Sequence, residues 1–393
     1  MKILVLCANH SLGDERVVVR QSLSLAQKGH DVTVLGRADP DKRLPVHPRL
    51  DLRSTAPLIR GASLASKARR VKVLLGLRRK ILELRPDVVV AHEPDSALVA
   101  LAARRKAGVP IHMDVHECFE EMAADRAPRL LRGFVRFIAW RVMAFLGERC
   151  DWVTVVSPTT ARQFQQLRTD GRVDILHNSP RCGLYPVCNH DTGDEITLCH
   201  EGWLGHSYGM RQLLEAVALV RERIRVRLIL VGKIRVGAEQ AYADLIRQHR
   251  LESVVRATGW LPYDEVGRMD AQAQIGLVVM QPSGNNYGSL SNKLYSYMAC
   301  GQAVIVPVGS ASEELVTRYQ CGVAVDVTQP SKIAEAIIRL AADVPRRKQY
   351  GSNARRAIVE ELSWERMEHV LDRIYTALAP PAVPQESTFQ SAS

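Results

Sequence analysis

The stretch from residue 288 to residue 308 carries the most suggestive chemistry in this chain. It reads GSLSNKLYSYMACGQAVIVPV: a loop of small residues, a helical segment of about ten residues and an apolar run. Ser291 is suited to the N-cap, because its hydroxyl can accept from a backbone N–H two or three residues on. Gly301 suits the left-handed position just past a helix end. The apolar run Ala303–Val308 predicts a buried strand.

The start of such a helix is a potential anion site. Its first N–H groups have no partner within the helix, and the positive end of the helix dipole points outward. We interpret the loop Gly288–Ser291 as holding the diphosphate of a nucleotide-sugar. A capped helix with nothing bound explains the same local pattern.

The overall charge also favours an anionic partner. The net charge is +11, which suits phosphate-bearing substrates, an acidic membrane surface or nucleic acid. Nucleic acid is the weakest of these, because aromatic residues make up only 5% of the chain and no known binding module is recognised. The eight cysteines form no CxxC pair and predict reduced thiols. Cys182 and Cys188 with the nearby His190 and His200 fit no common zinc spacing, so no metal is expected.

The order of apolar and amphipathic segments predicts an α/β protein. A chain of 393 residues exceeds the roughly 250–300 residues of a single core, which predicts two domains. Lys2–Cys7, Arg16–Lys28 and Asp31–Leu35 read as a strand, a helix and a strand, the opening of a parallel sheet. The alternation restarts at Ile196–Cys199, after a connection rich in proline and glycine over residues 181–194.

Two basic stretches stand out in the first half. Arg60–Lys80 and Pro128–Gly147 combine arginine or lysine with apolar residues, and the second also contains phenylalanine and tryptophan. Basic amphipathic helices of this kind suit an anionic membrane surface, although a solvated helix packed on the core has the same pattern. No secretory signal and no apolar stretch of about 18–20 residues is recognised, which predicts a cytoplasmic protein that is soluble or peripheral.

Seven segments, taken together and in order, resemble family 4 of the retaining glycosyltransferases, which has the GT-B architecture. They include LGDERVVVRQSLSLAQKGHDVTVLGR, RPDVVVAHEPD with IHMDVHECFEEM, WVTVVSP with DILHNSP, HEGWLGHSYGMRQLLEAV, VRLILVGK, VRATGWLPYDEV and SNKLYSYMACGQAVIVP. The resemblance implies two facing Rossmann-like, doubly wound domains with the donor in the cleft. It also implies transfer of a sugar with retained configuration and without a metal ion or other cofactor.

The resemblance assigns the catalytic residues to the first half. The family's histidine corresponds to His116, which would touch the donor sugar, with Glu117 beside it positioning the acceptor or sugar. A structural loop histidine and a helix-capping glutamate are the alternatives. Gly13 would let the first loop approach the diphosphate or acceptor closely, or it simply forms a turn. Asp14 and Arg16 fit the family's pattern, although a surface pair is the simpler interpretation.

The donor-binding residues would lie in the second half. Lys233 follows a strand and could reach phosphate or base, or it is a solvated lysine. Gly259 lies where the family holds the nucleobase, next to Trp260, for which packing is the alternative. Lys293 lies in the first helical turn, where it adds charge unless it points outward. The diphosphate would accept from the backbone N–H groups of Ser289, Leu290 and Ser291. Gly288 precedes them in the loop.

The chain departs from the family at three donor positions. Trp203 and Tyr208 stand where many members carry cations that contact the diphosphate, and Ser296 stands where the family has a ribose-binding glutamate. Losing two cations would cost several kcal/mol of leaving-group stabilisation. Lys233, Lys293, Arg211 or a cation from the facing domain could compensate. Otherwise the donor differs, or the chain has lost catalysis.

We therefore expect a metal-independent glycosyltransferase that moves a sugar from a nucleotide-sugar to a glycan or lipid-linked acceptor in surface polysaccharide synthesis. A non-catalytic relative that binds a nucleotide, glycan or partner enzyme is the main alternative, and a sugar-nucleotide epimerase is a further one. The expected parts are an acceptor-side domain over residues 1–180, a donor domain over 181–362, C-terminal helices over 363–379 that pack back on the first domain, and a disordered tail over 380–393.

Overall fold

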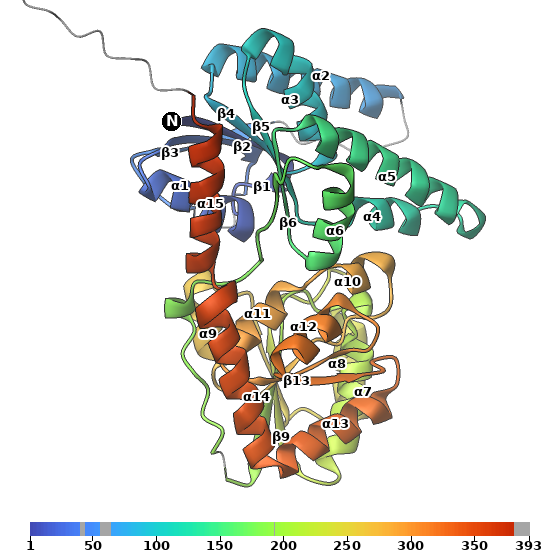
Figure 1. Cartoon of the computed structure of the whole chain (residues 1–393). Helices are drawn as coiled ribbons and strands as arrows, with labels where there is room; N and C mark the ends of the chain where they lie inside the picture. The colour runs from blue at the N-terminus through green and yellow to red at the C-terminus, as the bar shows by residue number, and fades with distance from the viewer. Residues whose placement is uncertain (40–43, 56–63, 192, 381–393) are drawn as a thin grey trace, which may run out of the picture. The chain divides into compact units, whose positions relative to one another are not determined.

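We describe the protein from a computed structural model, over residues 1–39, 44–55, 64–191 and 193–380 (Figure 1). By packing, the chain divides into two compact units. The first comprises Met1–Met113, Cys150–Trp152 and Leu371–Ser393, and the second comprises Asp114–Arg149 and Val153–Val370. The predicted tail over residues 380–393 lies, beyond residue 380, outside the described residues.

A seven-stranded sheet is built from the first half of the chain. Its strand order is β3-β2-β1-β4-β5-β6-β7, and the strand pairs described in detail are parallel. Strands β4 and β5 are buried along their whole length, as expected for parallel strands covered on both faces. The strands are β1 Lys2–Ser11, β2 Asp31–Arg37, β3 Leu50–Thr55, β4 Val88–Ala91, β5 Ile111–Val115, β6 Trp152–Val155 and β7 Val173–Ile175.

The predicted opening of this sheet is confirmed, with one difference in its helix. Residues Glu15–Ser22 form a π-helix (η1), and only Leu23–Gln27 (α1) is α-helical. Strand β3 is absent from the sequence interpretation, because its sequence LDLRST is mostly exposed and lacks an apolar run. The remaining helices of this half are α2 Leu64–Leu84, α3 Pro94–Ala107, α4 Phe119–Asp125, η2 Arg129–Leu131, α5 Arg132–Arg149 and α6 Pro158–Leu167.

The second half forms a six-stranded sheet, as its restarted alternation predicts. The order is β10-β9-β8-β11-β12-β13, and its ladder pairs are parallel. The predicted buried strand after the central helix is β12, Ala303–Pro307. The other strands are β8 Glu195–Glu201, β9 Arg225–Val231, β10 Val255–Gly259, β11 Ile275–Leu277 and β13 Gly322–Val325.

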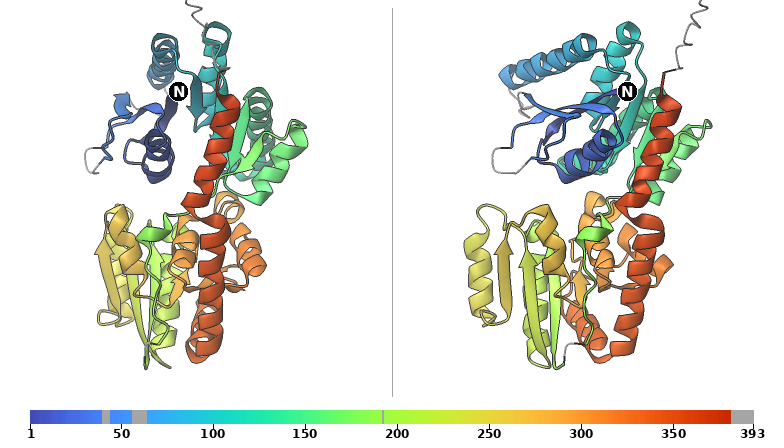
Figure 2. Two further views of the ribbon diagram at one scale, coloured as in Figure 1. Left: turned by 60° about the vertical axis from the view of Figure 1, so that its left-hand side comes forward. Right: turned by 90° about the vertical axis from the view of Figure 1, so that its left-hand side faces the viewer.

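Helices cover both faces of this second sheet (Figure 2). One core packs α7 Met210–Arg221, α8 Glu239–Gln248 and α13 Pro330–Ala342 against the strands. The other packs α9 Tyr263–Asp270, α11 Asn292–Ala299, α12 Ala311–Tyr319 and α14 Val344–Ala357. Helix α12 was not predicted, although Ser310 accepts from the N–H of Glu313 and the Glu313 carboxylate accepts from Gly309, a recognisable capping signal. A π-helical segment, η5 Ile358–Leu362, follows α14.

The last helix, α15, spans Trp364–Leu378 as the sequence predicts. Its C-terminal part belongs to the first unit. There Asp372 pairs with Lys28 at 2.5 Å, and the hydroxyl of Tyr375 lies 3.1 Å from Nδ1 of His112. The boundaries proposed at residues 180 and 362 stay a prediction.

Candidate functional site

The start of α11 is open, but its cap differs from the prediction. Ser291 occupies the N-cap with extended backbone, yet its hydroxyl makes no capping hydrogen bond. The predicted role of that hydroxyl is therefore wrong. Gly301, in contrast, has the predicted left-handed conformation with φ +66°. Because no side chain of the described residues caps α11, its first N–H groups remain available to an anion.

The loop before α11 supplies fewer donors than predicted. Short helix α10, Gly284–Gly288, ends there, and the N–H of Ser289 already donates to the carbonyl of Asn285 at 3.2 Å. The hydroxyl of Ser289 donates to the same carbonyl. The side chain of Leu290 is buried in the core. Of the three predicted amides, those of Leu290 and Ser291 are left for a ligand.

Lys293 is the cation at this site. Its side chain is buried, with 5% relative exposure, rather than turned outward. A Cβ added at Gly202 would lie 3.7 Å from its Cε and Nζ, and Nζ lies 5.3 Å from the ring centroid of Tyr208. Within the described residues this ammonium has no hydrogen bond or ion pair. Burial lowers the pKa of Lys293 to about 8, and the charge of Glu201 opposes that shift.

Glu201, the last residue of β8, is a site residue that sequence reasoning missed. The hydroxyl of Ser296 donates to its Oε1 at 3.2 Å, and its own N–H donates to the hydroxyl of Tyr297 at 2.8 Å. The side chain is 9% exposed. The only sequence signal was an acidic residue directly before Gly202, at the carboxyl end of a strand where ligands of parallel sheets lie.

A second carboxyl group, that of Asp270, lies behind Glu201. Burial and then the charge of Glu201, with a hydrogen bond between the two, raise the pKa of Asp270 well above its ordinary value. Oε2 of Glu201 and Oδ2 of Asp270 are both buried without a donor among the described residues. The raised pKa favours the protonated form of Asp270, whose proton can join these two oxygens. The thiol of Cys199 donates to the other oxygen of Asp270 at 3.1 Å.

The carboxyl ends of β8, β9 and β10 converge next to Lys293. The N–H of Gly232 donates to the carbonyl of Gly259 at 3.0 Å, and the N–H of Leu204 donates to the carbonyl of Lys233 at 2.9 Å. Gly232 has φ +136°, and a Cβ there would lie 1.9 Å from the carbonyl oxygen of Gly202, so no other residue fits. Thus the structure brings Lys233 and Gly259 to neighbouring strand ends.

Two exposed tryptophans follow the carboxyl ends of β8 and β10. Trp203 and Trp260 are 46% and 41% exposed, and their ring centroids lie 6.4 Å apart at an interplanar angle of 49°. Lys233 is also exposed. Such exposed aromatic faces are suited to stacking against a planar ligand group.

His116 and Glu117 follow β5 and precede α4. The His116 side chain is 8% exposed, and its Nδ1 lies 3.6 Å from Oδ2 of Asp114. Thr154 donates to the other oxygen of Asp114 at 2.7 Å, which fixes that carboxylate beside the imidazole.

The segment that follows His116 lies against α10. The N–H of Cys118 donates to Oδ1 of Asn285 at 3.3 Å, and a Cβ at Gly288 would lie 3.3 Å from Sγ of Cys118. The two predicted catalytic residues are therefore near the loop that leads into α11.

Gly13 lies in the turn between β1 and η1, in the first unit. Asp14 is the N-cap of η1, since its carboxylate accepts from the N–H of Val17 at 2.9 Å. Oδ2 of Asp14 also lies 3.2 Å from Nδ1 of His10. The other ring nitrogen of His10, Nε2, lies 3.8 Å from Oε1 of Glu93. Asp14 is thus a helix cap rather than half of a surface pair with Arg16, which is buried. His10 and Glu93 were not singled out from the sequence.

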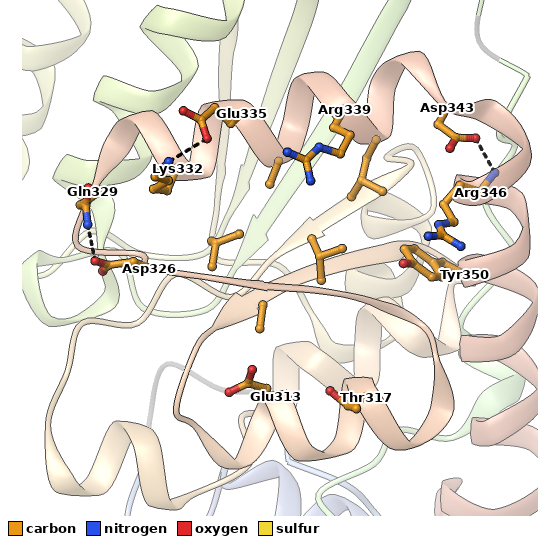
Figure 3. A pocket seen from close by; sticks show the side chains of 15 residues that line it. Glu313, Thr317, Asp326, Gln329, Lys332, Glu335, Arg339, Asp343, Arg346 and Tyr350 are labelled. Atoms are coloured by element: carbon orange, nitrogen blue, oxygen red, sulfur yellow. Dashed lines mark hydrogen bonds and ion pairs between the residues drawn. The ribbon is translucent and has the colours of Figure 1, made fainter.

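A separate pocket of about 650 Å³ lies along the edge strand β13, between α12, α13 and α14 (Figure 3). None of the predicted site residues lines it. Several of its polar side chains are already paired, including Asp326 with Gln329 and Lys332 with Glu335. It is distinct from the group around Lys293.

Comparison with known families identifies the class of protein. Residues 13–179 match the model described as Glycosyltransferase Family 4, and residues 189–357 match the model described as Glycosyl transferases group 1. An uncharacterized glycosyltransferase of Methanocaldococcus jannaschii is 23% identical over 185 residues, 47% of this chain and 46% of that relative. The chain thus matches about half the length of this curated relative.

Solved structures show the same fold over nearly the whole chain. Sucrose-phosphate synthase from Thermosynechococcus elongatus has a TM-score of 0.74 at 19% identity, covering 96% of this chain and 99% of that one. HepE of Anabaena, solved with UDP-glucose, has a TM-score of 0.70 at 17% identity, covering 96% and 100%. WaaG, a glycosyltransferase involved in lipopolysaccharide biosynthesis, has a TM-score of 0.70 at 15% identity, covering 95% and 99%. The chain belongs to the family 4 glycosyltransferases with the GT-B fold.

Proposed function

We propose that this glycosyltransferase moves a sugar from a nucleoside diphosphate sugar to a glycan or lipid-linked acceptor of a surface polysaccharide, with retained configuration and without a metal ion. The observation that carries the proposal is the ammonium of Lys293, held on a buried side-chain stem beside the uncapped start of α11. An ammonium and free backbone amides together suit a diphosphate.

The chemistry requires stabilisation of the departing diphosphate. Negative charge grows on the leaving group as the bond to the sugar breaks, and fixed donors aimed at that charge lower the barrier. Lys293 and the amides at Leu290 and Ser291 supply such donors without a divalent cation. His116, which lies beside Asp114, would contact the sugar from the loop after β5.

A panel of donors tests this function. UDP-, GDP-, ADP- and TDP-sugars are incubated with the protein and with lipid-linked or glycan acceptors, with and without EDTA, and nucleotide release is followed. We expect one donor to release nucleotide with EDTA present, and NMR of the product to show the donor's anomeric configuration. Heat of binding without turnover for every donor would favour the non-catalytic alternative.

We further propose that the protein contacts an anionic membrane through η2 and α5. No described helix is both long and apolar enough to cross a membrane, but this segment exposes an unusual set of apolar side chains. Arginines interleave with them at 129, 132, 136 and 141, and only Arg136 has an acidic partner in an ion pair described here, Glu121 at 2.8 Å. The exposed apolar residues are Leu130, Leu131, Phe134, Phe137, Ile138, Val142 and Phe145.

Vesicle co-sedimentation tests the membrane contact. Replacing Arg129, Arg132 and Arg136 with serine is expected to weaken binding to phosphatidylserine vesicles by about 1 kcal/mol per residue. The matched control replaces three exposed arginines elsewhere, Arg318, Arg339 and Arg346, and should change little. Equal loss from both triple variants would mean that only total charge matters.

A further inference from the structure

We propose that Glu201 provides the carboxylate that binds the ribose of the donor, in place of the glutamate that position 296 lacks, and that Lys293 provides the adjacent cation for the diphosphate. This inference rests on the proposed function, because it concerns how the same donor is held. The family resemblance does not mark Glu201, to which we assign ribose binding. The two assignments together explain the departures from the family pattern at Ser296 and Tyr208.

The geometry around Ser296 supports the first assignment. Ser296 is buried in α11, and its hydroxyl donates to Oε1 of Glu201 at 3.2 Å. The carboxylate of Glu201 therefore lies beside the residue that stands where the family has its ribose-binding glutamate. A serine side chain is shorter than that of a glutamate, and the carboxylate from β8 occupies the neighbourhood that a glutamate at 296 would reach.

Glu201 keeps the capacity to accept from a ligand. A carboxylate offers about four acceptor positions, and Ser296 and the proton of Asp270 use two of them. Glu201 is the last residue of β8, at the carboxyl end of a parallel strand, where ligands of such sheets lie. Oε2 of Glu201 is buried, so Oε1 is the oxygen that accepts from a ribose hydroxyl, beside the hydroxyl of Ser296.

Lys293 is suited to the second assignment because no described residue forms a hydrogen bond or an ion pair with it. Its side-chain stem is buried, and its ammonium keeps its donors for a ligand. It lies against the backbone of Gly202, the residue after Glu201, and over the ring of Tyr208. Tyr208 stands at one of the two missing cation positions, so the cation reaches this location from α11 instead.

Calorimetric titration separates the two roles. UDP, GDP and ADP are titrated first, and the tightest of them is compared with its 2′,3′-dideoxy analogue and with its monophosphate. For the wild type we expect the dideoxy analogue to bind at least tenfold more weakly, as for loss of hydrogen bonds to a charged group. In Glu201→Gln this ratio should fall to about threefold or less, while the diphosphate-to-monophosphate ratio stays unchanged.

Two further variants make the reciprocal test. Lys293→Met should reduce the diphosphate-to-monophosphate ratio and leave the ribose ratio intact. The double variant Glu201→Gln with Ser296→Glu should regain ribose discrimination, because the carboxylate returns to position 296. Glu195→Gln, at the exposed start of the same strand β8 and paired with Arg227, is the control, and thermal unfolding confirms that each variant is folded.

The outcomes distinguish the inference from the proposed function. If the wild type binds a nucleoside diphosphate and turns over a donor, but folded Glu201→Gln keeps full ribose discrimination, the ribose assignment is wrong and the transferase function stands. If folded Lys293→Met keeps the diphosphate preference, the second assignment fails in the same way. If the wild type binds none of the three diphosphates, both the inference and the proposed donor class fail.

Discussion

Strands β1 and β8 belong to two similar parallel sheets, and a loop follows each of them. The helix starts next to these two loops differ in whether a side chain caps them. After β1, Asp14 caps η1 through the N–H of Val17, so the helix start is satisfied by its own chain. After β8, the N–H of Met210 at the start of α7 donates to the carbonyl of Gly205, whereas α11, whose Lys293 lies next to this loop, has no side-chain cap. The difference indicates that the second region is left open for an anion and the first is not.

The charged groups show the same contrast. In the first unit His10, Asp14 and Glu93 form a connected group. In the second unit the carboxylate of Glu201 is held by Ser296, while the ammonium of Lys293 has no direct partner among the described residues. A lysine on a buried stem that has no ion-pair partner favours a functional explanation over a purely structural one.

The largest expected effect concerns His116. His116→Ala should lower the transfer rate by about 100-fold or more, in the range found when a group that contacts the reacting centre is removed. Steady-state kinetics with the preferred donor measure it, and circular dichroism checks the fold. The exposed His369 offers a matched control, since His369→Ala removes an imidazole far along the chain in α15. Near-normal rates for His116→Ala would remove it from the mechanism.

The next effect is a pH dependence of donor binding. The folded pKa of Lys293 is about 8, so its positive charge is lost as the pH rises above that value. We expect the affinity for the nucleoside diphosphate to fall by up to about tenfold per pH unit above 8, and to be flatter in Lys293→Met. Titration calorimetry between pH 7 and pH 10 measures both. If the affinity falls equally steeply with pH in the wild type and in Lys293→Met, Lys293 does not bind the diphosphate.

Stability should change with pH in the opposite direction. Burial lowers the pKa of Lys293 from 10.5 to about 8, so between these values the unfolded chain binds more protons than the native one. The free energy of unfolding should therefore rise with pH across this window, by up to about 3 kcal/mol. Urea denaturation of the wild type and of Lys293→Met measures the difference, and the variant should lack this contribution.

The smallest effect tests the contrast between the two helix starts. Asp14→Ala should cost about 1 kcal/mol of unfolding free energy, because it removes a capping bond. Ser291→Ala should lower the unfolding free energy by only about 0.3 kcal/mol, because the Ser291 hydroxyl makes no capping hydrogen bond. Urea denaturation of the two variants gives both values, and a larger loss at Ser291 would contradict the open helix start.

Much of the fold follows from local sequence. The predicted strands Asp31–Leu35, Ile196–Cys199 and Ala303–Val308 are found as β2, β8 and β12, because short apolar runs define them. The family pattern, carried by motifs in order, also identified the class of enzyme. Edge strand β3 and helix α10 were missed because neither carries an apolar run.

The details of the site depended on the tertiary structure. The sequence predicted that a helix begins near Ser291 with Lys293 in its first turn, and the structure confirms both. It could not determine where that lysine points, because residues 293–299 are all buried and the helix offers no polar face to orient them. Nor could it pair Glu201 with Ser296, which are 95 positions apart. That contact exists because parallel strands and the helices between them converge at one edge of a sheet, which is a property of the folded chain rather than of any local pattern.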